Sequence, residues 1–373
     1  MSRLRLLHEA GQSVWLDFIE RSMLQDGTLR RLIEEDALSG MTSNPTIFEK
    51  ALGSSVYDAQ IAALAGELEP ARVFEHIACD DVRLACDIFL PLFEATNGRD
   101  GFVSIEVSPE HAHDAAGTVE EARRLWKMVG RPNAMIKVPG TESGLVAVRQ
   151  LIAEGINVNV TLLFSLVAYG KVIEAYLGGL EDRFARGESL TSIASVASFF
   201  VSRVDTAVDR LLEQLATERA GGEREVLLGL RGKAAIANAR RAYRLFRSSF
   251  AGERWARLER AGARLQRPLW ASTSTKNPAY RDVMYVEELI GPDTVNTLPP
   301  VTLEAFRDHG VVQRTVDRAL DEADAVMVRL AEIGVDIEGV TAKLLDEGVA
   351  AFQHSYEGAL AGVERKAKQL VVR

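Results

Sequence analysis

Long apolar runs are missing from this sequence of 373 residues. A transmembrane helix needs about 18 apolar residues in succession, and the longest candidate, residues 160–169, is interrupted by Thr161 and Ser165. Near the N-terminus, His8 and Glu9 break up the apolar core that a signal peptide requires. We therefore expect a cytoplasmic protein that has no membrane partner.

Cysteine is almost absent, and basic residues are not in excess. The two cysteines, Cys79 and Cys86, are seven residues apart, which matches neither a zinc site nor a redox motif and favours two buried thiols on one helix face. The net charge of −9 and a pI near 5.4 argue against a nucleic-acid partner, which needs a basic face. His111 and His113 lack a third metal ligand, and no dinucleotide or phosphate-loop motif occurs, so we expect no metal and no cofactor.

Eight short β-type runs alternate with amphipathic helical stretches along the chain. The expected strands are 14–19, 39–44, 102–107, 134–138, 156–163, 193–200, 268–274 and 294–298. The expected helices include 71–93, 119–128, 144–154, 166–177, 204–218 and 281–289. This alternation predicts a parallel α/β sheet, and eight units predict a (β/α)8 TIM barrel, with a doubly wound open sheet as the second choice.

A (β/α)8 barrel needs only about 250 residues, so the chain has residues to spare. The surplus falls in an Ala- and Arg-rich segment near 222–263, whose composition favours helix, and in helices from about residue 301 onward. No Pro-, Gly- or Ser-rich linker interrupts the chain. We therefore expect residues 1–373 to form one barrel domain with a helical insertion and a helical C-terminal region.

Polar residues lie inside or directly after the apolar strands, mostly toward their carboxyl ends. They are Asp17, Asn44, Glu106, Lys137, Asn159, Thr161, Ser198, Arg203, Ser274 and Lys276. Taken singly, a buried serine or asparagine more often satisfies the backbone than it binds a ligand. Their recurrence at the same end of successive strands predicts a site, because barrel enzymes place their active sites at that end.

Lysine is scarce, with nine in the chain, and Lys137 alone lies within an apolar strand, residues 134–139. Burial disfavours the charged form of an amine, and a neutral amine condenses with a carbonyl to form a Schiff base. A buried ion pair between Lys137 and a carboxylate such as Glu106 accounts for the same pattern equally well.

The other polar residues suit a sugar phosphate. Asp17 and Glu106 can exchange protons, and the amides of Asn44 and Asn159 can orient hydroxyl groups. Arg203 and a lysine later in the chain can hold a phosphate group. A nucleophilic amine combined with these groups predicts carbon–carbon bond chemistry on a sugar phosphate.

Seven segments resemble the transaldolase family, whose members are class I Schiff-base enzymes of the aldolase type. The segments are 14–17, 42–45, 103–109, 136–144, 155–165, 198–203 and 270–278. The most specific is 155–165, and the Lys-Val-Pro-Gly and Ser-Thr-Lys-Asn segments are similar to a bacterial subgroup. The resemblance spans nearly the whole chain.

The resemblance implies a TIM barrel that transfers a dihydroxyacetone unit between sugar phosphates of the pentose phosphate pathway. Lys137 matches the Schiff-base lysine, and Asp17 matches the residue that takes the proton from the C4 hydroxyl. Glu106 and Thr161 match residues that hold a catalytic water.

The resemblance also implies a substrate site. The matching residues are Asn44, Asn159 and Ser198 for the dihydroxyacetone hydroxyls, Phe200 for the wall, and Arg203 and Ser274 for the phosphate. Lys276 stands where better-known members have a second phosphate-binding arginine, and a lysine offers a point charge instead of a planar fork. A sugar-phosphate aldolase with the same Schiff base and a non-catalytic sugar-phosphate binder are the alternatives, and a homo-oligomer is left open.

Overall fold

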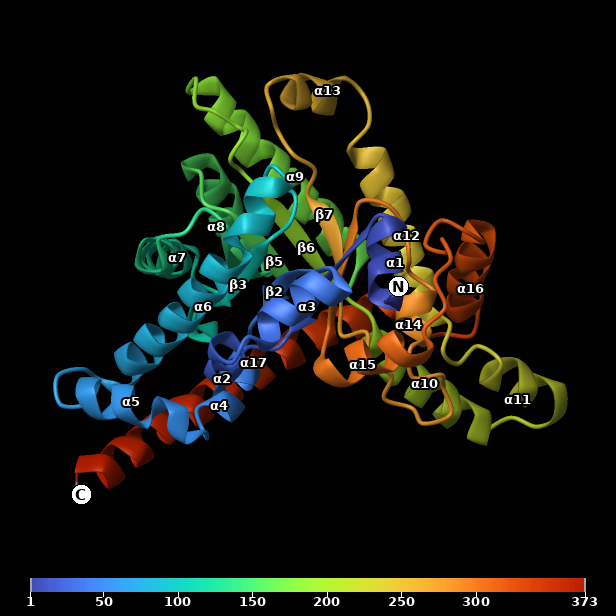
Figure 1. Cartoon of the computed structure of the whole chain (residues 1–373). Coiled ribbons are helices and arrows are strands. Elements are labelled where there is room, and N and C mark those ends of the chain that lie inside the picture. Colours follow the sequence, from blue (N-terminus) through green and yellow to red (C-terminus); the bar gives the residue numbers. More distant parts are fainter. Residues whose placement is uncertain (1, 372–373) are drawn as a thin grey trace.

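The computed structural model describes residues 2–371 (Figure 1). Eight parallel strands close into a barrel in chain order, each paired with the next and β8 paired with β1. The strands are β1 (Gln12–Asp17), β2 (Leu38–Thr42), β3 (Phe102–Glu106), β4 (Ala134–Pro139), β5 (Val158–Leu163), β6 (Ser195–Phe200), β7 (Arg267–Ala271) and β8 (Thr294–Leu298). All eight predicted strands are confirmed. Because the sheet closes between β8 and β1, the alternative of an open doubly wound sheet is excluded.

Helices surround the barrel and extend beyond it. Between β1 and β4 lie α2 (Arg21–Gln25), α3 (Thr28–Asp36), α4 (Pro45–Ala51), η1 (Ser55–Tyr57), α5 (Asp58–Leu64), α6 (Pro70–Ala95), η2 (Pro109–His111) and α7 (Ala115–Val129), and α1 (Arg3–Glu9) precedes β1. Between β4 and β7 lie α8 (Glu142–Glu154), α9 (Leu166–Ala185), α10 (Ser202–Thr217), α11 (Gly221–Leu228), α12 (Ala234–Ser249) and α13 (Glu253–Arg260). The remaining helices are α14 (Met284–Glu287), α15 (Pro300–His309), α16 (Leu320–Glu332) and α17 (Ile337–Val371).

The strands are buried on both faces because side chains fill the barrel inside and helices cover it outside. Fully buried Trp15 shows how tightly the interior is filled. It lies beside Gly40 on β2, where an added Cβ would come within 2.5 Å of the indole. A glycine is therefore required at this position of β2.

Two differences from the sequence expectations concern the second half of the chain. The helix expected at 281–289 is only the short α14, because the preceding residues form turns. Strand β7 ends at Ala271, so Ser274 lies in the loop that follows and not in the strand. The segment near 222–263 is helical, and its α12 packs against α9 and β7.

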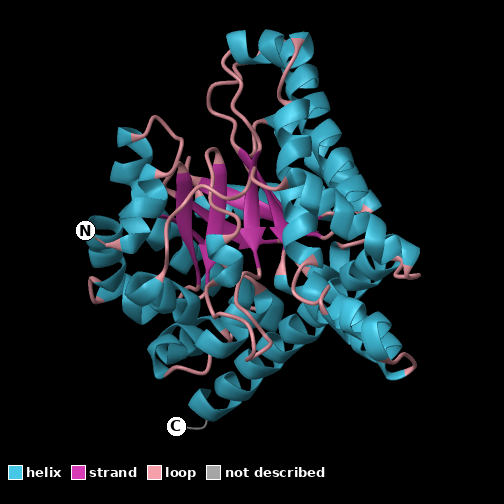
Figure 2. Ribbon diagram, turned by 90° about the vertical axis from the view of Figure 1, so that its right-hand side faces the viewer, coloured by secondary structure: helices cyan, strands magenta, loops and turns pink. Residues whose placement is uncertain are grey.

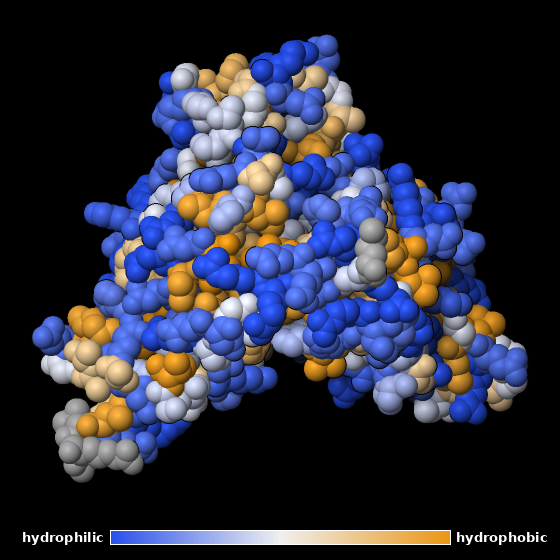
Figure 3. All heavy atoms as spheres, in the orientation of Figure 1, coloured by the Kyte–Doolittle hydropathy of each residue, from blue (hydrophilic) through white to orange (hydrophobic). Residues whose placement is uncertain are grey.

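Helix α17 lies across the carboxyl ends of the strands, below the barrel in Figures 1 and 2. It packs against α4, α6, α10 and β5. The face seen in Figure 3 is largely hydrophilic and is hollowed along its lower edge, between the lobe of α5 and the lobe of α10 and α11. Both cysteines are buried on α6 as expected. No helix within residues 2–371 is long and apolar enough to cross a membrane.

Candidate active site

Register brings three predicted residues to the same level of the barrel. Glu106 on β3 pairs with Lys137 on β4, which pairs with Asn159 on β5. Lys137 is 5% exposed, and its Nζ donates to Glu106 Oε2 and to the Ser43 carbonyl, both at 2.9 Å. The buried ion pair that the sequence left open is therefore present, and it places a carboxylate beside the amine.

Asp17, at the carboxyl end of β1, is the second carboxylate. Its Oδ1 accepts a hydrogen bond of 2.7 Å from Thr42, whose hydroxyl in turn lies 2.7 Å from that of Thr297. Burial raises the pKa of Asp17 above its usual range, although Lys137, the Thr42 hydroxyl and Arg203 oppose the rise. A carboxylate with a raised pKa is a more effective proton acceptor near neutral pH.

Glu106 has the same direction of shift. Burial raises the pKa of Glu106 most, the ammonium of Lys137 and its hydrogen bond lower it, and the nearby charge of Asp17 raises it further. Two carboxylates and one amine thus share a buried site. Such coupled groups exchange protons readily, and this is the property that imine chemistry requires.

Asn159 is fixed by two hydroxyl groups. Its Nδ2 donates to Ser104 at 3.1 Å, and its Oδ1 accepts from Ser198 at 2.7 Å, so three strands hold the amide in one orientation. Thr161, two residues further along β5, is fully buried, and its Oγ1 has no hydrogen-bond partner among residues 2–371. This hydroxyl is thus available to a substrate or water oxygen.

Asn44 has a structural role in addition to the predicted contact with a substrate hydroxyl. Its Oδ1 accepts from the Ile47 amide at 3.0 Å and so caps α4. The cap directs the chain after β2 and keeps Ser43 next to Lys137. The amide nitrogen of Asn44 is the part of the side chain that fits the predicted hydroxyl contact.

Phe200 ends β6, and Arg203 lies in the first turn of α10, where its guanidinium stacks over the Phe200 ring at 5.3 Å. Burial lowers the pKa of Arg203, while Asp17 and Glu347 raise it. Within the described part of the chain, Arg203 forms neither a hydrogen bond nor a salt bridge, so its five donors are free for an anion. It lines a groove of about 810 Å³ between α10 and α17.

Ser274 and Lys276 follow β7 at the same end of the barrel, but they are not in the same cavity as Arg203. The Ser274 hydroxyl lies 2.6 Å from that of Thr302, and exposed Lys276 lines a smaller cavity of about 170 Å³. The two cavities adjoin, since Thr206 and Arg210 of α10 line both. The structure thus brings the predicted phosphate residues near each other without joining them in one pocket.

Helix α17 contributes to the site, which was not predicted from the sequence. The Phe352 ring lies 5.8 Å from Lys137 Nζ, and Gly348 lies so close to Leu162 that a Cβ would come within 2.8 Å. Leu162 itself has φ +60, a conformation that is rare for leucine and costs about 1–3 kcal/mol. Neither a leucine in a strand nor a phenylalanine about 200 residues from Lys137 signals such a role.

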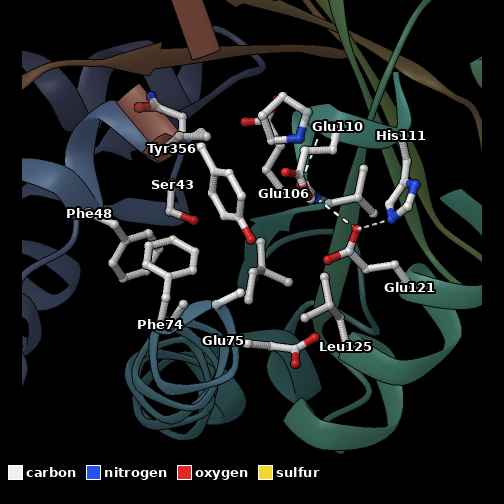
Figure 4. Close-up of a pocket in the computed structure, with 18 of the residues that line it drawn as sticks. Ser43, Phe48, Phe74, Glu75, Glu106, Glu110, His111, Glu121, Leu125 and Tyr356 are labelled. Atoms are coloured by element: carbon white, nitrogen blue, oxygen red, sulfur yellow. Dashed lines mark hydrogen bonds and ion pairs between the residues drawn. The ribbon is translucent and has the colours of Figure 1, made fainter. Parts of the chain in front are cut away.

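A side pocket of about 220 Å³ adjoins the centre between α4, α6, α7 and α17 (Figure 4). Glu106 lies in its wall, Tyr356 points into it, and Glu121 accepts from the Ser108 amide at 2.9 Å and faces His111. Lys137 and Asp17 do not line it. The side pocket is therefore open to Glu106 and not to Lys137 or Asp17.

Comparison with known proteins decides the family. The family model described as transaldolase/fructose-6-phosphate aldolase matches residues 14–363. The chain belongs to this family. "Transaldolase 2" of a Nostoc species is 46% identical over 379 residues, covering 99% of both chains. "Transaldolase" of Thiobacillus denitrificans is 48% identical over 355 residues, covering 95% of this chain and 97% of its own, and "Transaldolase" of Mycobacterium tuberculosis is 47% identical over 361 residues, covering 96% and 95%.

Membership in the transaldolase/fructose-6-phosphate aldolase family agrees with the resemblance seen in the sequence and with the observed barrel. The arrangement combines a buried amine, two carboxylates, oriented amide and hydroxyl groups, and an unpaired guanidinium. Together these groups can form an imine with a ketose, move protons at its hydroxyls and hold an anionic end.

Proposed function

We propose that the chain is a transaldolase that transfers a dihydroxyacetone unit from sedoheptulose 7-phosphate to glyceraldehyde 3-phosphate, giving erythrose 4-phosphate and fructose 6-phosphate. The observation that carries the proposal is the contact of 2.9 Å between buried Lys137 and Glu106, with Asp17 close enough to influence both. Full-length similarity to proteins named transaldolase supports it.

The first half of the reaction forms the imine. Glu106 takes a proton from the Lys137 ammonium, and the neutral amine adds to the C2 carbonyl of the ketose. The carbinolamine hydroxyl then leaves as water after protonation, giving the protonated Schiff base. Glu106 and the unpartnered Thr161 hydroxyl hold the water that leaves here and returns at the final hydrolysis.

The second half breaks and remakes the carbon–carbon bond. Asp17 accepts the proton of the C4 hydroxyl, the C3–C4 bond breaks, and its electron pair moves into the iminium to give an enamine while the aldehyde leaves. The enamine then attacks the carbonyl of the acceptor aldehyde, and Asp17 returns its proton to the new hydroxyl. Asn44, Asn159 and Ser198 orient the hydroxyls of the bound unit.

The phosphate end lies toward α10. Arg203 supplies an unpaired guanidinium there, its ring contact with Phe200 fixes its direction, and Ser274 and Lys276 stand on the neighbouring loop. Anchoring a remote phosphate aligns the reacting carbons even though the anchor takes no proton.

Coverage by α17 favours a transferase over an aldolase that releases free dihydroxyacetone. The enamine must survive until an acceptor aldehyde arrives, and water or a stray proton would discharge it. Phe352 above Lys137 and the close crossing at Gly348 limit access of water to this point.

Borohydride trapping tests the Schiff base. Incubation with fructose 6-phosphate and borohydride should inactivate the enzyme and attach a reduced three-carbon unit to Lys137. Lys137→Arg should abolish both labelling and turnover, because a guanidinium does not form the imine. Label on any other lysine would overturn the assignment.

A coupled assay with and without acceptor separates the two activities. Cleavage of fructose 6-phosphate itself yields glyceraldehyde 3-phosphate, so the acceptor for this donor is erythrose 4-phosphate. With erythrose 4-phosphate omitted, a transaldolase releases little dihydroxyacetone from fructose 6-phosphate, whereas an aldolase releases it at the full rate. Equal rates of dihydroxyacetone release with and without the acceptor would assign the chain to the aldolase branch of the family.

A further inference from the structure

Two buried aspartates on α10 form a network that the proposed chemistry does not use. Asp205 and Asp209 lie one helical turn apart and are 1% and 6% exposed. Asp209 accepts from the Gly232 amide at 2.9 Å and from the Tyr280 hydroxyl at 2.5 Å. Asp205 accepts from the Ala235 amide at 2.7 Å and from the Tyr285 hydroxyl at 2.9 Å.

The network joins three segments that are distant in the sequence. Helix α10 begins next to Arg203, the Gly232 amide lies just before α12 and the Ala235 amide in its first turn, and the two tyrosines belong to the connection between β7 and β8. The same connection carries Ser274 and Lys276. The proposed phosphate residues on both sides are thus fastened to one another through side chains that lie outside the groove beside Arg203 and line the smaller cavity that contains Lys276.

The loop after β7 is held at both of its ends. At the first end, the Ser202 amide donates to the Ser272 carbonyl and the two hydroxyls lie 2.9 Å apart. At the other end, the Tyr280 hydroxyl reaches Asp209, only four residues after Lys276. Ser272 has φ +56, a strained conformation for a residue other than glycine, which persists only where the surroundings fix it.

Packing alone would not favour this arrangement. Buried carboxylates are costly, and apolar residues of similar size would fill the space more cheaply. Gly232 has φ +71, and a Cβ there would lie 3.0 Å from the Tyr280 ring, so the backbone comes close to the ring at the point where its amide meets Asp209. Helix α12 has no side-chain cap of its own at Lys233, and Asp205 of α10 accepts from the free Ala235 amide of its first turn instead.

We propose that the Asp209–Tyr280 and Asp205–Tyr285 pairs are positioning residues that hold the Ser274–Lys276 loop at a fixed distance from Arg203 and so set the preference for phosphorylated donors. This inference rests on the proposed function. The four side chains leave the catalysis to Lys137 and Asp17, and they act through the position of the loop that carries Lys276, whose cavity they line.

The variant Tyr280→Phe tests the proposal, because it removes one hydroxyl and keeps the ring over Gly232. We expect KM for fructose 6-phosphate to rise about threefold to tenfold, because one of the hydrogen bonds that hold the loop is lost, with kcat within twofold. Unphosphorylated fructose should react as with the wild type. Asp209→Asn should have a smaller effect, since the amide oxygen still accepts from Gly232 and its nitrogen can donate to Tyr280.

Tyr176→Phe is the matched control. The Tyr176 hydroxyl donates to the Arg264 carbonyl at 2.6 Å, and Arg264 precedes β7 at the opposite end of the barrel. Thermal unfolding should show a comparable loss of stability in Tyr176→Phe and Tyr280→Phe, whereas only Tyr280→Phe should change KM.

The outcomes separate the two proposals. If Tyr280→Phe leaves KM unchanged, or lowers kcat/KM equally for both donors, the network is structural only and the positioning role is overturned. If the wild type itself gives no turnover of fructose 6-phosphate and no borohydride label on Lys137, the proposed function fails instead.

Discussion

The two ends of the proposed substrate site are built in different ways. At the proposed nucleophile, Glu106, Lys137 and Asn159 come from adjacent strands, and backbone register sets their spacing. At the proposed phosphate end, Arg203 lies on a helix and Lys276 on a loop after β7, and the backbone hydrogen bonds that continue the β6–β7 ladder stop at Ser202 and Ser272. Side-chain hydrogen bonds replace the ladder there.

The difference indicates where each end can change. Moving Lys137 relative to Glu106 would require a shift in the register of the whole barrel, which would also turn the buried faces outward. Moving Lys276 relative to Arg203 requires the loss of only one or two hydroxyl contacts. The chemistry is therefore resistant to single substitutions outside the site, while the phosphate preference is open to adjustment.

The largest expected effect distinguishes the roles of two groups at the nucleophile end. Asp17→Ala should lower the rate by about 10²–10⁴-fold, as is typical when a general base is removed. It should still permit imine formation, so borohydride should trap the intact sugar on Lys137, and mass spectrometry should find the whole ketose and not a three-carbon fragment.

Asp81→Asn is a suitable control for Asp17→Ala. Asp81 is another buried aspartate whose pKa burial raises, and it is held by Arg21 at 2.7 Å and Tyr57 at 2.8 Å on the outer side of the barrel. Its variant should lose stability and keep its kcat. Normal cleavage by Asp17→Ala would make Asp17 structural and leave Glu106 as the candidate base.

The same contrast explains what could be predicted from the sequence. Apolar strands of period two show which residues share a face, and the barrel rule says at which end function lies, so Asp17, Glu106, Lys137 and Asn159 could be grouped before their contacts were known. Whether Lys137 is a nucleophile or an ion-pair partner could not be decided, because the register that brings Glu106 to 2.9 Å is set by the closure of the barrel.

Contacts that depend on long-range packing left no local signal. Phe352 reaches Lys137 only because α17 crosses the mouth of the barrel, and a phenylalanine in a helix is ordinarily a core residue. The left-handed conformation of Leu162 likewise occurs where Gly348 of α17, distant in the sequence, packs against it. The placement of Lys276 in a cavity separate from Arg203 follows from the path of the loop after β7, which composition does not specify.

At the phosphate end the expected effect is smaller. Arg203→Ala removes an unpaired guanidinium, and a charge-assisted contact contributes about 1.5–3 kcal/mol, so KM for phosphorylated donors should rise about 10–100-fold with a modest fall in kcat. For unphosphorylated fructose, kcat/KM of the same variant should be nearly that of the wild type. An equal proportional loss for both donors would show that Arg203 supports the barrel and does not bind phosphate.

Lys276→Arg is the companion variant for Arg203→Ala. The charge remains, and the exposed position beside the small cavity leaves room for the larger group, so activity should be retained. A loss of kcat/KM comparable to that of Arg203→Ala would mean that the loop requires a lysine at position 276. Lysine and arginine would then not be equivalent there.

The smallest effect concerns stability and pH at the phosphate end. Burial raises the pKa of Asp205 to about 7 from 3.8, although the Ala235 amide and the Tyr285 hydroxyl lower it, and nearby Asp209 raises it. Between these two pH values the folded protein keeps a proton that the unfolded chain has lost. The contribution of this group to the free energy of unfolding therefore falls as pH rises from about 4 to about 7.

Asp205→Asn should remove that contribution, because asparagine imitates the protonated acid: its oxygen accepts from Ala235 and its nitrogen donates to Tyr285. Thermal unfolding of wild type and variant at pH 5 and pH 8 measures the change. Asp17 and Glu106 titrate in both proteins, so their effects cancel in the difference between the two. We expect the Tm of the variant to improve relative to the wild type as pH rises. Parallel Tm curves would show that Asp205 is already ionised throughout this range, with its charge stabilised by the amides of α12.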